Sequence, residues 1–322
     1  MAAGLFAACG PGQDPVPVRQ DPPATRESLA TGGGEPGLGR SPDPTPLTIT
    51  VLRVSSAAGG GDAILVADSA AEPPRHVLID AGDDATAARA LREAGLRTLD
   101  LLVLTHAHHD HYGGMDEVLD AVTVRAFAFN GQVRTAVTYR RLLDRIEREV
   151  PLVIVVDSVR RVRLGEGEGA TTLTLIPPLS TYLGADTDRG ERLNEGSLAV
   201  RIERGAFSFL TTGDAEREAN RRFSARFPEL VDVDVLKLGH HGSRDATDRA
   251  WLAATTPEAA IVSANGTTHP HAAVLALLKG RGIPLYCTPQ HGAVRVRVAP
   301  DGAYHITTEL PAERECAPGR SQ

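Results

Sequence analysis

The chain has 322 residues, with 34 lysines and arginines against 41 aspartates and glutamates. The formal net charge of -7 excludes a histone-like or ribosomal role, because such proteins hold polyanions with a strongly basic surface. Hydrophobic residues make up 42% of the chain, and no stretch approaches the roughly 20 consecutive apolar residues of a membrane-spanning helix. We therefore expect one large globular domain with tails and no integral membrane segment.

Residues 1–46 are rich in residues that favour turns. They contain nine prolines and eight glycines, a composition that cannot bury a core and predicts a disordered segment. Within it, Leu5–Cys9 resembles the end of a bacterial lipoprotein signal, although no basic region precedes it and the apolar run is short. The compartment stays open: extracytoplasmic or lipid-anchored through Cys9 if the signal is truncated, and cytoplasmic otherwise.

Strands and helices are expected in alternation from Leu47 onward. In the first half, strands are predicted at 47–54, 63–67, 76–80 and 101–104, with a helix from Asp83 or Asp84 to Ala94 and an amphipathic, solvated helix within 134–148. In the second half, strands are predicted at 172–176, 198–203, 207–211, 233–238, 259–263, 285–287 and 293–298, with helices at 215–226, 247–254 and 272–279. Paired strands with helices between them predict two mixed sheets packed face to face, with helices outside.

The predicted folded domain spans residues 47–310, and residues 311–322 are expected to be a disordered tail. The three cysteines, Cys9, Cys287 and Cys316, lie far apart and form no CxxC pair. Their spacing implies neither a disulfide framework nor a thiolate zinc site.

Four histidines and one aspartate crowd into the six residues His106-Ala107-His108-His109-Asp110-His111, directly after an apolar strand. Crowded imidazoles must each be kept neutral or paired, and metal coordination does this best. Alternate residues of a tight turn share a face, so His106 and His108 point one way while Asp110 and His111 reach a second position. One loop can thereby serve two ions.

The pattern His106-x-His108-x-Asp110-His111 resembles the signature of the metallo-β-lactamase superfamily. Other segments resemble its competence-protein branch, the extracytoplasmic hydrolase domain of a DNA-uptake channel protein. They are Gly61–Leu65, Leu78–Gly82, Asn194–Leu198, Leu210–Glu216, Leu236–Ser243 and Thr288–Ala293. The resemblance covers about 47–298 and implies a four-layer αββα hydrolase fold.

Carried over residue by residue, the resemblance implies two divalent ions. His106 and His108 would hold the first ion and Asp110, His111 and His240 the second, with Asp214 bridging both. The alternative for Asp214 is a helix N-cap. Mixed imidazole and carboxylate ligands suit Zn²⁺, and Mn²⁺ or Fe²⁺ would also bind such oxygen-rich sites. A water shared by two such ions loses a proton near neutral pH and becomes a bridging hydroxide nucleophile.

The first ion lacks its usual third histidine, because no histidine occurs between Tyr112 and Gly213. Asn194 and Ser197 are the candidates to complete this site through oxygen or through water. We expect the first site to be the weaker one and to be partly occupied.

Several further residues are assigned around the ions. His240 and His241 cannot both coordinate one ion comfortably, so His240 is taken as the ligand and His241 as a proton donor or phosphate contact, with the reverse left open. Asp80 would orient a ligand imidazole; Asp62 would do the same or serve as a turn residue. Lys237, Ser243 and His269 would line the mouth or be structural.

The leading hypothesis is hydrolysis of a phosphodiester, with Asp110 and His241 as catalytic residues and a small molecule or a nucleic acid as substrate. A small ester, lactone or β-lactam is the second hypothesis. A degenerate, non-catalytic metal-binding domain is the third. No specific protein partner is implied.

Overall fold

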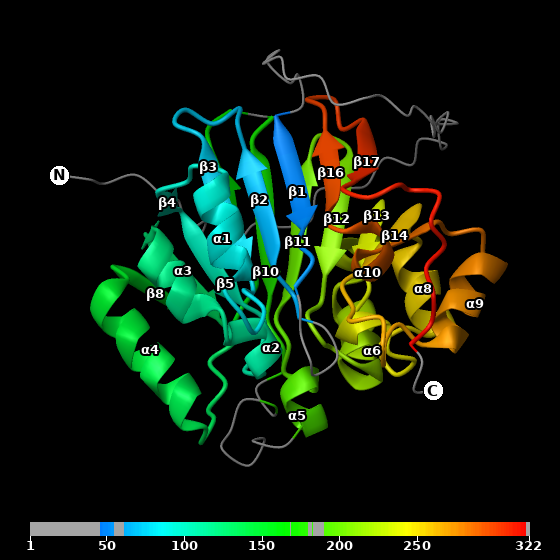
Figure 1. Cartoon of the computed structure of the whole chain (residues 1–322), viewed down its shortest axis with the longest axis horizontal. Helices are drawn as coiled ribbons and strands as arrows, with labels where there is room; N and C mark the ends of the chain where they lie inside the picture. Colours follow the sequence, from blue (N-terminus) through cyan, green and yellow to red (C-terminus); the bar gives the residue numbers. More distant parts are fainter. Residues whose placement is uncertain (1–45, 55–60, 168, 180–181, 183–189, 320–322) are drawn as a thin grey trace.

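The computed structural model describes residues 46–54, 61–167, 169–179, 182 and 190–319. Over these residues two large β-sheets pack face to face, and helices cover both outer faces (Figure 1). The expected four-layer αββα sandwich is therefore confirmed. The predicted disordered segment lies outside the described residues up to residue 45, and Cys9 lies outside them with it.

The first sheet has eight strands in the order β17-β16-β1-β2-β3-β5-β7-β8. Their bounds are β1 (Leu47–Val51), β2 (Ile64–Asp68), β3 (Arg75–Ile79), β5 (Leu101–Leu104), β7 (Ala126–Phe129), β8 (Leu152–Val155), β16 (Val294–Val298) and β17 (Tyr304–Thr308). From β3 to β8 the neighbours are parallel, and the others are antiparallel.

The second sheet has seven strands in the order β15-β14-β13-β12-β11-β10-β9. Their bounds are β9 (Arg160–Leu164), β10 (Thr171–Ile176), β11 (Ala199–Arg204), β12 (Phe207–Thr211), β13 (Val235–Lys237), β14 (Ala259–Val262) and β15 (Leu285–Cys287). From β12 to β15 the neighbours are parallel. β4 (Thr98–Leu99) and β6 (Thr123–Val124) form a separate pair.

Helices connect the strands and cover the sheets. They are α1 (Thr86–Glu93), α2 (His109–Tyr112), α3 (Met115–Ala121), α4 (Val137–Glu149), α5 (Gly190–Glu195), α6 (Arg217–Arg226), α7 (Pro228–Val231), α8 (Arg249–Thr255), α9 (Ala272–Gly280), α10 (Thr288–His291) and the short 3-10 helix η3 (His240–Gly242).

Three buried apolar clusters hold the four layers together. One lies between the sheets and includes Ile49, Val103 and Phe209. A second joins the first sheet to α1, α3 and α4, and a third joins the second sheet to α6, α8 and α9. The alternation along the strands divides side chains between these clusters: Leu102 and Leu104 face the helices.

Four strands of the two large sheets were not among those expected, β7, β8, β9 and β17, and neither was the separate pair β4 and β6. β8 and β9 lie at sheet edges, where side chains stay exposed and the apolar pattern is weak. β16 and β17 return to the first sheet, so the two sheets are not simply the two halves of the chain.

Residues 311–319 are not a disordered tail, contrary to the expectation. Cys316 forms a disulfide with Cys287, and Gly319 N donates to Pro270 O at 3.0 Å. The spacing of the cysteines implied no disulfide framework, but the fold brings the two Cα atoms to 5.9 Å across a separation of 29 residues.

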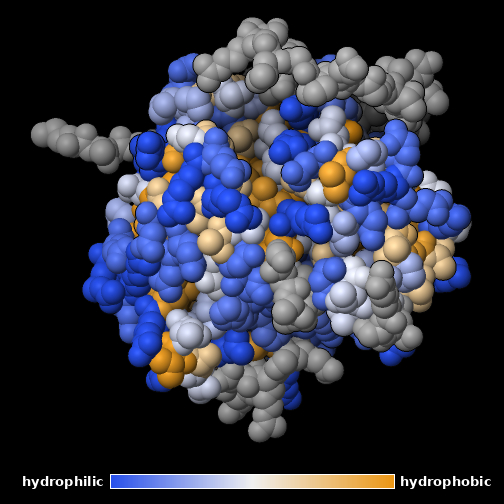
Figure 2. Space-filling model, viewed as in Figure 1, coloured by the Kyte–Doolittle hydropathy of each residue, from blue (hydrophilic) through white to orange (hydrophobic). Residues whose placement is uncertain are grey.

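The surface visible in Figure 2 is mainly hydrophilic, with smaller apolar patches between the polar regions. Among the described residues, the helices are all too short or too polar to cross a bilayer.

Candidate metal centre

Three loops that follow strand ends carry the predicted site residues. His106 to His111 follow β5, Asp214 follows β12, and His240 and His241 follow β13. Parallel neighbouring strands end at the same edge of a sheet, so these loops gather at one end of the sandwich. In Figure 1 this is the lower end, where α2 lies.

Asp80 fixes the loop that follows β5. Its carboxylate accepts hydrogen bonds from Thr105 N at 2.8 Å and from Thr105 Oγ1 at 2.7 Å, and it lies 2.7 Å from His111 Nδ1. With Nδ1 held by a carboxylate, His111 directs Nε2 to the other side, where Asp214 Oδ2 lies 3.3 Å away.

A second clamp holds the same loop from the segment that follows β7. Ala107 N donates to Gln132 Oε1 at 2.9 Å, and the Arg134 guanidinium donates to Ala107 O. Both polar backbone atoms of Ala107 are thereby fixed. Because Ala107 lies between His106 and His108, these contacts also position the two histidines.

Asp110, His111, Asp214 and His241, which we name the Asp110 group, bring one candidate ligand atom each within 4.8 Å of one another. His241 Nε2 lies 3.3 Å from Asp110 Oδ2 and 3.5 Å from Asp214 Oδ2. Three of the four side chains are buried.

His106, His108 and Asp214, which we name the His106 group, are also mutually within 4.8 Å. His106 Nε2 lies 2.9 Å from His108 Nδ1 and 3.8 Å from Asp214 Oδ2. Asp214 therefore belongs to both groups, the position expected of a bridging carboxylate.

His240 and His241 take the reverse of their expected positions. His241 lies in the Asp110 group, whereas His240 Nδ1 pairs with Glu216 Oε1 at 2.8 Å. The physical reason is the backbone turn: both residues have left-handed φ angles, 45° and 53°, which send adjacent side chains in different directions.

The backbone of the site is strained. Asp80, His240 and His241 are three of the four non-glycine residues that have a positive φ in the described chain. Such conformations cost about 1 to 3 kcal/mol each and persist where the surroundings enforce them.

The Asp110 group pairs protonated imidazoles with ionised carboxylates. Burial opposes a charged His241, but Asp214 and Asp110 outweigh it and raise the pKa of His241 to about 10. Burial likewise opposes a charged His111, yet Asp214 and Asp80 hold its pKa well above the ordinary value. Burial alone would raise the pKa values of Asp110 and Asp214, but the neighbouring histidines lower both.

The His106 group behaves differently. Burial, together with the charge of His111, lowers the pKa of His106 well below its ordinary value. Burial also lowers the pKa of His108, and Asp214 and Asp110 only partly oppose this. These two imidazoles are therefore neutral at pH 7, the form that binds a metal.

A cation fits the space between these side chains. His111 Nε2, His241 Nε2 and Asp214 Oδ1 are buried atoms for which the described residues supply no hydrogen bond. Buried polar atoms without hydrogen bonds are costly. The ionised Asp214 carboxylate is a good metal ligand, and so are the two imidazoles once they have lost their protons. The donor set of both groups thus suits divalent ions.

The two candidates to complete the first site are both buried. Ser197 Oγ accepts a hydrogen bond from Asp214 N at 3.2 Å, which gives it a structural contact. Asn194 Nδ2 donates to Glu216 Oε1 at 3.0 Å, while Asn194 Oδ1 is buried without a hydrogen bond from the described residues. Of the two side chains, Asn194 therefore has the oxygen that is more available to bind an ion.

Asp62 and Lys237 form a buried pair behind His241. Lys237 Nζ contacts Asp62 Oδ2, and both side chains are at most 1% exposed. Asp62 Oδ1 lies 3.6 Å from His241 Nδ1, which is also 3.1 Å from Ser263 O. Lys237 is thus structural, one of the two roles considered for it, because it is the last residue of a fully buried strand.

The remaining two predicted residues differ in position. Ser243 Oγ accepts a hydrogen bond from Asp245 N at 3.3 Å, so it is a turn residue. The ring of His269 stacks on that of His240 at 5.7 Å and lies 6.3 Å from that of His241. Burial, followed by the charges of His241 and His240, lowers the pKa of His269 to about 4.

Sequence reasoning missed four residues that hold the site: Gln132, Arg134, Glu216 and Ser263. Only Glu216 had a signal, because it lies two residues after Asp214 within a segment already singled out. The other three act through backbone atoms or from loops without a motif.

Comparison with known proteins places this geometry in a family. The model of the family described as "Metallo-beta-lactamase superfamily" matches residues 57–266. The chain is 29% identical to ComE operon protein 3 of Bacillus subtilis (strain 168) over 64% of its own length and 26% of that protein. It is 27% identical to Competence protein ComA of Neisseria gonorrhoeae over 74% of its own length and 31% of that protein.

The likeness to the competence-protein branch is thereby confirmed, and the chain spans less than a third of the length of these two relatives. A solved structure titled a metal-dependent hydrolase of the beta-lactamase superfamily matches 82% of this chain and 100% of that chain. Its TM-score is 0.51 at 13% identity, which supports the fold alone.

Proposed function

Because the chain belongs to the metallo-beta-lactamase superfamily, we propose that it is a metal-dependent phosphodiesterase with two divalent ions, Zn²⁺ or Mn²⁺. The observation that carries this proposal is the pair of ligand groups joined by Asp214. His106, His108 and Asp214 would hold one ion, and Asp110, His111, His241 and Asp214 the other. When bound, such ions lower the pKa of water and withdraw charge from a phosphoryl oxygen.

The residues of the chain supply orientation and protons. Asp80 and Ser263 O hold the outward nitrogens of His111 and His241, so both rings present Nε2 to Asp214. His240 takes over the proton-donor role first expected of His241. Burial opposes its charged form, but Asp214 and Glu216 raise the pKa of His240, which favours its protonated form. We therefore assign His240 as the donor to the leaving oxygen.

Arg134 favours an anionic substrate over a neutral one. Its guanidinium donates to Ala107 O, and Ala107 lies between His106 and His108. In addition to burial, the positive charge of Arg134 contributes to the lowered pKa of His108. A guanidinium in this place can bind the non-bridging oxygens of a phosphodiester. A neutral ester, lactone or β-lactam would gain less from it.

A degenerate metal-binding domain is the second candidate, and the missing third imidazole of the His106 group favours it. Turnover separates the candidates: purified protein is assayed with bis(p-nitrophenyl)phosphate, plasmid DNA and a chromogenic β-lactam, each with added Mn²⁺ or Zn²⁺. Metal-dependent cleavage of the two phosphodiesters supports the proposal. Cleavage of the β-lactam alone, or none with both ions bound, would reject it.

We also propose an oxidising, extracytoplasmic compartment. The Cys287–Cys316 disulfide supports it, because such bonds persist mainly outside the reducing cytosol. Fractionation of cells in which free thiols are blocked at lysis tests this, and recovery of the reduced protein from the cytosol would contradict it.

A further inference from the structure

The last described residues lie against a loop that borders the metal centre. We name residues 311–319 the strap and residues 265–271 the border loop. The chain reaches the strap from β17, with Leu310 N donating to His291 O at 2.8 Å. In Figure 1 the strap is the red segment that runs down the right side, past α8 in this view, toward the lower end of the sandwich.

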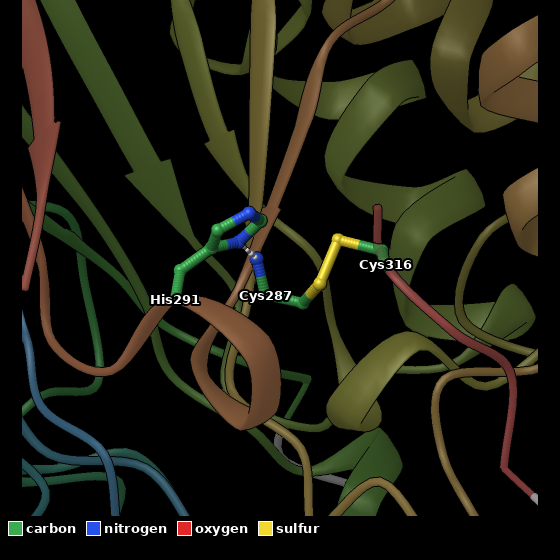
Figure 3. Close-up of side chains that lie close together, drawn as sticks. All are labelled: Cys287, His291 and Cys316. Carbon is green, nitrogen blue, oxygen red and sulfur yellow. Dashed lines mark hydrogen bonds between the residues drawn. A yellow bond between two sulfur atoms is a disulfide. The ribbon is translucent and has the colours of Figure 1, made fainter. Parts of the chain in front are cut away.

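One covalent bond and one imidazole fasten the strap (Figure 3). Cys316 is bonded to Cys287, the fully buried last residue of β15. His291 Nδ1 accepts a hydrogen bond from Cys287 N at 2.8 Å, so Nε2 carries the ring hydrogen and donates to Arg314 O at 2.7 Å. Because both ring nitrogens of His291 are occupied, these three residues form a fastening and not a metal site, although they lie close enough for one.

The far end of the strap contacts the border loop through its backbone. Gly319 N donates to Pro270 O at 3.0 Å. A Cβ atom on Gly319 would lie 2.7 Å from His269 N and closer still to the backbone of Thr268, so no larger residue fits without a shift.

The border loop in turn supports the turn that carries His241. His271 N donates to Gly242 O at 3.0 Å, and a Cβ on Gly242 would lie 2.8 Å from Pro270 Cβ. Gly242 directly follows His241, whose own backbone has a left-handed φ of 53°. Such a conformation persists only where the surroundings enforce it, and the border loop is one of those surroundings.

We propose that the strap is a positioning element of the metal centre and that the Cys287–Cys316 bond fastens it, so that opening this bond weakens metal binding at the Asp110 group. The proposal rests on the proposed metal-dependent function. A phosphine reductant opens the bond: the disulfide takes up two electrons and two protons to give two thiols, while the phosphine takes the oxygen of water and becomes the phosphine oxide.

The first experiment measures Mn²⁺ affinity of the full chain before and after reduction, in a Cys9→Ser background that removes the third thiol. Mn²⁺ is the probe because it prefers oxygen and imidazole over thiolate, so the released thiols do not compete for it. We expect reduction to weaken Mn²⁺ binding at the tighter site by about 3- to 10-fold. This is at or below the lower end of the roughly 10- to 100-fold loss that follows when a residue hydrogen-bonded to a metal ligand is changed. Circular dichroism must show that the reduced protein is folded.

Two variants separate the strap from the thiol chemistry. Cys287→Ser/Cys316→Ser should match the reduced protein, with or without reductant. Gly319→Ala should lower Mn²⁺ affinity about 2- to 3-fold with the disulfide intact, because it dislodges only the far end. Gly280→Ala is the matched control, since a Cβ there meets no atom within 4 Å.

Equal Mn²⁺ affinity of the oxidised and reduced proteins, with both folded, would overturn the proposal. So would free Cys287 and Cys316 in protein purified without reductant and mapped by mass spectrometry. If the double serine variant does not fold, reduced wild-type protein and Gly319→Ala decide the outcome. Failure of phosphodiester cleavage is a separate result, because Mn²⁺ binding is measured without substrate.

Discussion

The Asp110 group and the His106 group share Asp214 and differ in almost everything else. The Asp110 group combines two carboxylates with two imidazoles whose pKa values are raised, whereas the His106 group has two imidazoles whose pKa values are lowered. Each raised imidazole also has an oxygen behind its other nitrogen. One shared carboxylate thus joins a charged group of candidate ligands, whose imidazoles are held from behind, to a neutral and less complete group.

The largest effect should come from Asp214→Asn, which removes the carboxylate common to both groups. We expect both ions to be lost and hydrolysis to be abolished, with a fall in metal affinity beyond the roughly 10- to 100-fold typical of changes around a ligand. Metal analysis of the purified variant measures this. Retention of two ions would show that Asp214 does not join the groups.

Asp110→Asn should affect one group only. It removes a carboxylate from the Asp110 group while leaving His106 and His108 in place, so we expect the variant to lose the ion of the Asp110 group, to stay folded and to be inactive. Asp116→Asn is the matched control, because Asp116 is an exposed residue paired with Arg145. An active Asp110→Asn protein that still binds two ions would contradict the division into two groups.

The sequence predicted the first loop better than the rest of the site, and there is a physical reason. His106, His108, Asp110 and His111 lie within six residues, so their proximity does not depend on the fold. The choice between His240 and His241 depends on two left-handed φ angles that no residue type announces.

The fold was predictable to a similar degree. The buried strand 101–104 shows a clear apolar pattern and was found, whereas β7, which is also buried, was missed. The edge strand β9, with its sequence RRVRL, was not found, because its outer face is formed by arginines. The Cys287–Cys316 pair depends on contacts between β15 and the strap, which lie beyond the reach of local sequence patterns.

The pH dependence of metal binding should distinguish the two groups. In the metal-free protein His111 and His241 carry protons at pH 7, because their pKa values are raised, and a metal must displace these protons. Affinity of the Asp110 group should therefore rise with pH between 6 and 8, by up to about tenfold per unit for each proton displaced. His106 and His108 are already neutral, so the His106 group should change little.

The raised histidine pKa values also determine how the stability of the metal-free protein changes with pH. A raised histidine pKa stabilises the fold fully below the unfolded value of about 6.5, and this contribution is lost as pH rises through the folded value, about 10 for His241. The lowered histidine pKa values act in the opposite direction only near pH 6.5, so thermal melts of chelator-treated protein should show a Tm that falls from pH 8 to pH 10. Equal pH dependence of metal binding at both groups, or a Tm that rises over this range, would contradict the assigned protonation states.

The smallest effect concerns the incomplete His106 group. Two imidazoles and a shared carboxylate are fewer ligands than the Asp110 group has, so dialysis should empty this site first and leave closer to one ion than two per chain. Added divalent cation in the millimolar range should then raise phosphodiesterase activity as the site fills. Asn194 is the residue to change, because its Oδ1 is buried without a hydrogen bond from the described residues and its Nδ2 donates to Glu216, two residues after Asp214. Asn194→His should raise metal content after dialysis, and Asn194→Ala, which removes the oxygen without adding an imidazole, should lower it. Two tightly held ions after exhaustive dialysis of the wild-type protein would show that another residue completes the site, and equal metal content in both variants would remove Asn194 from it.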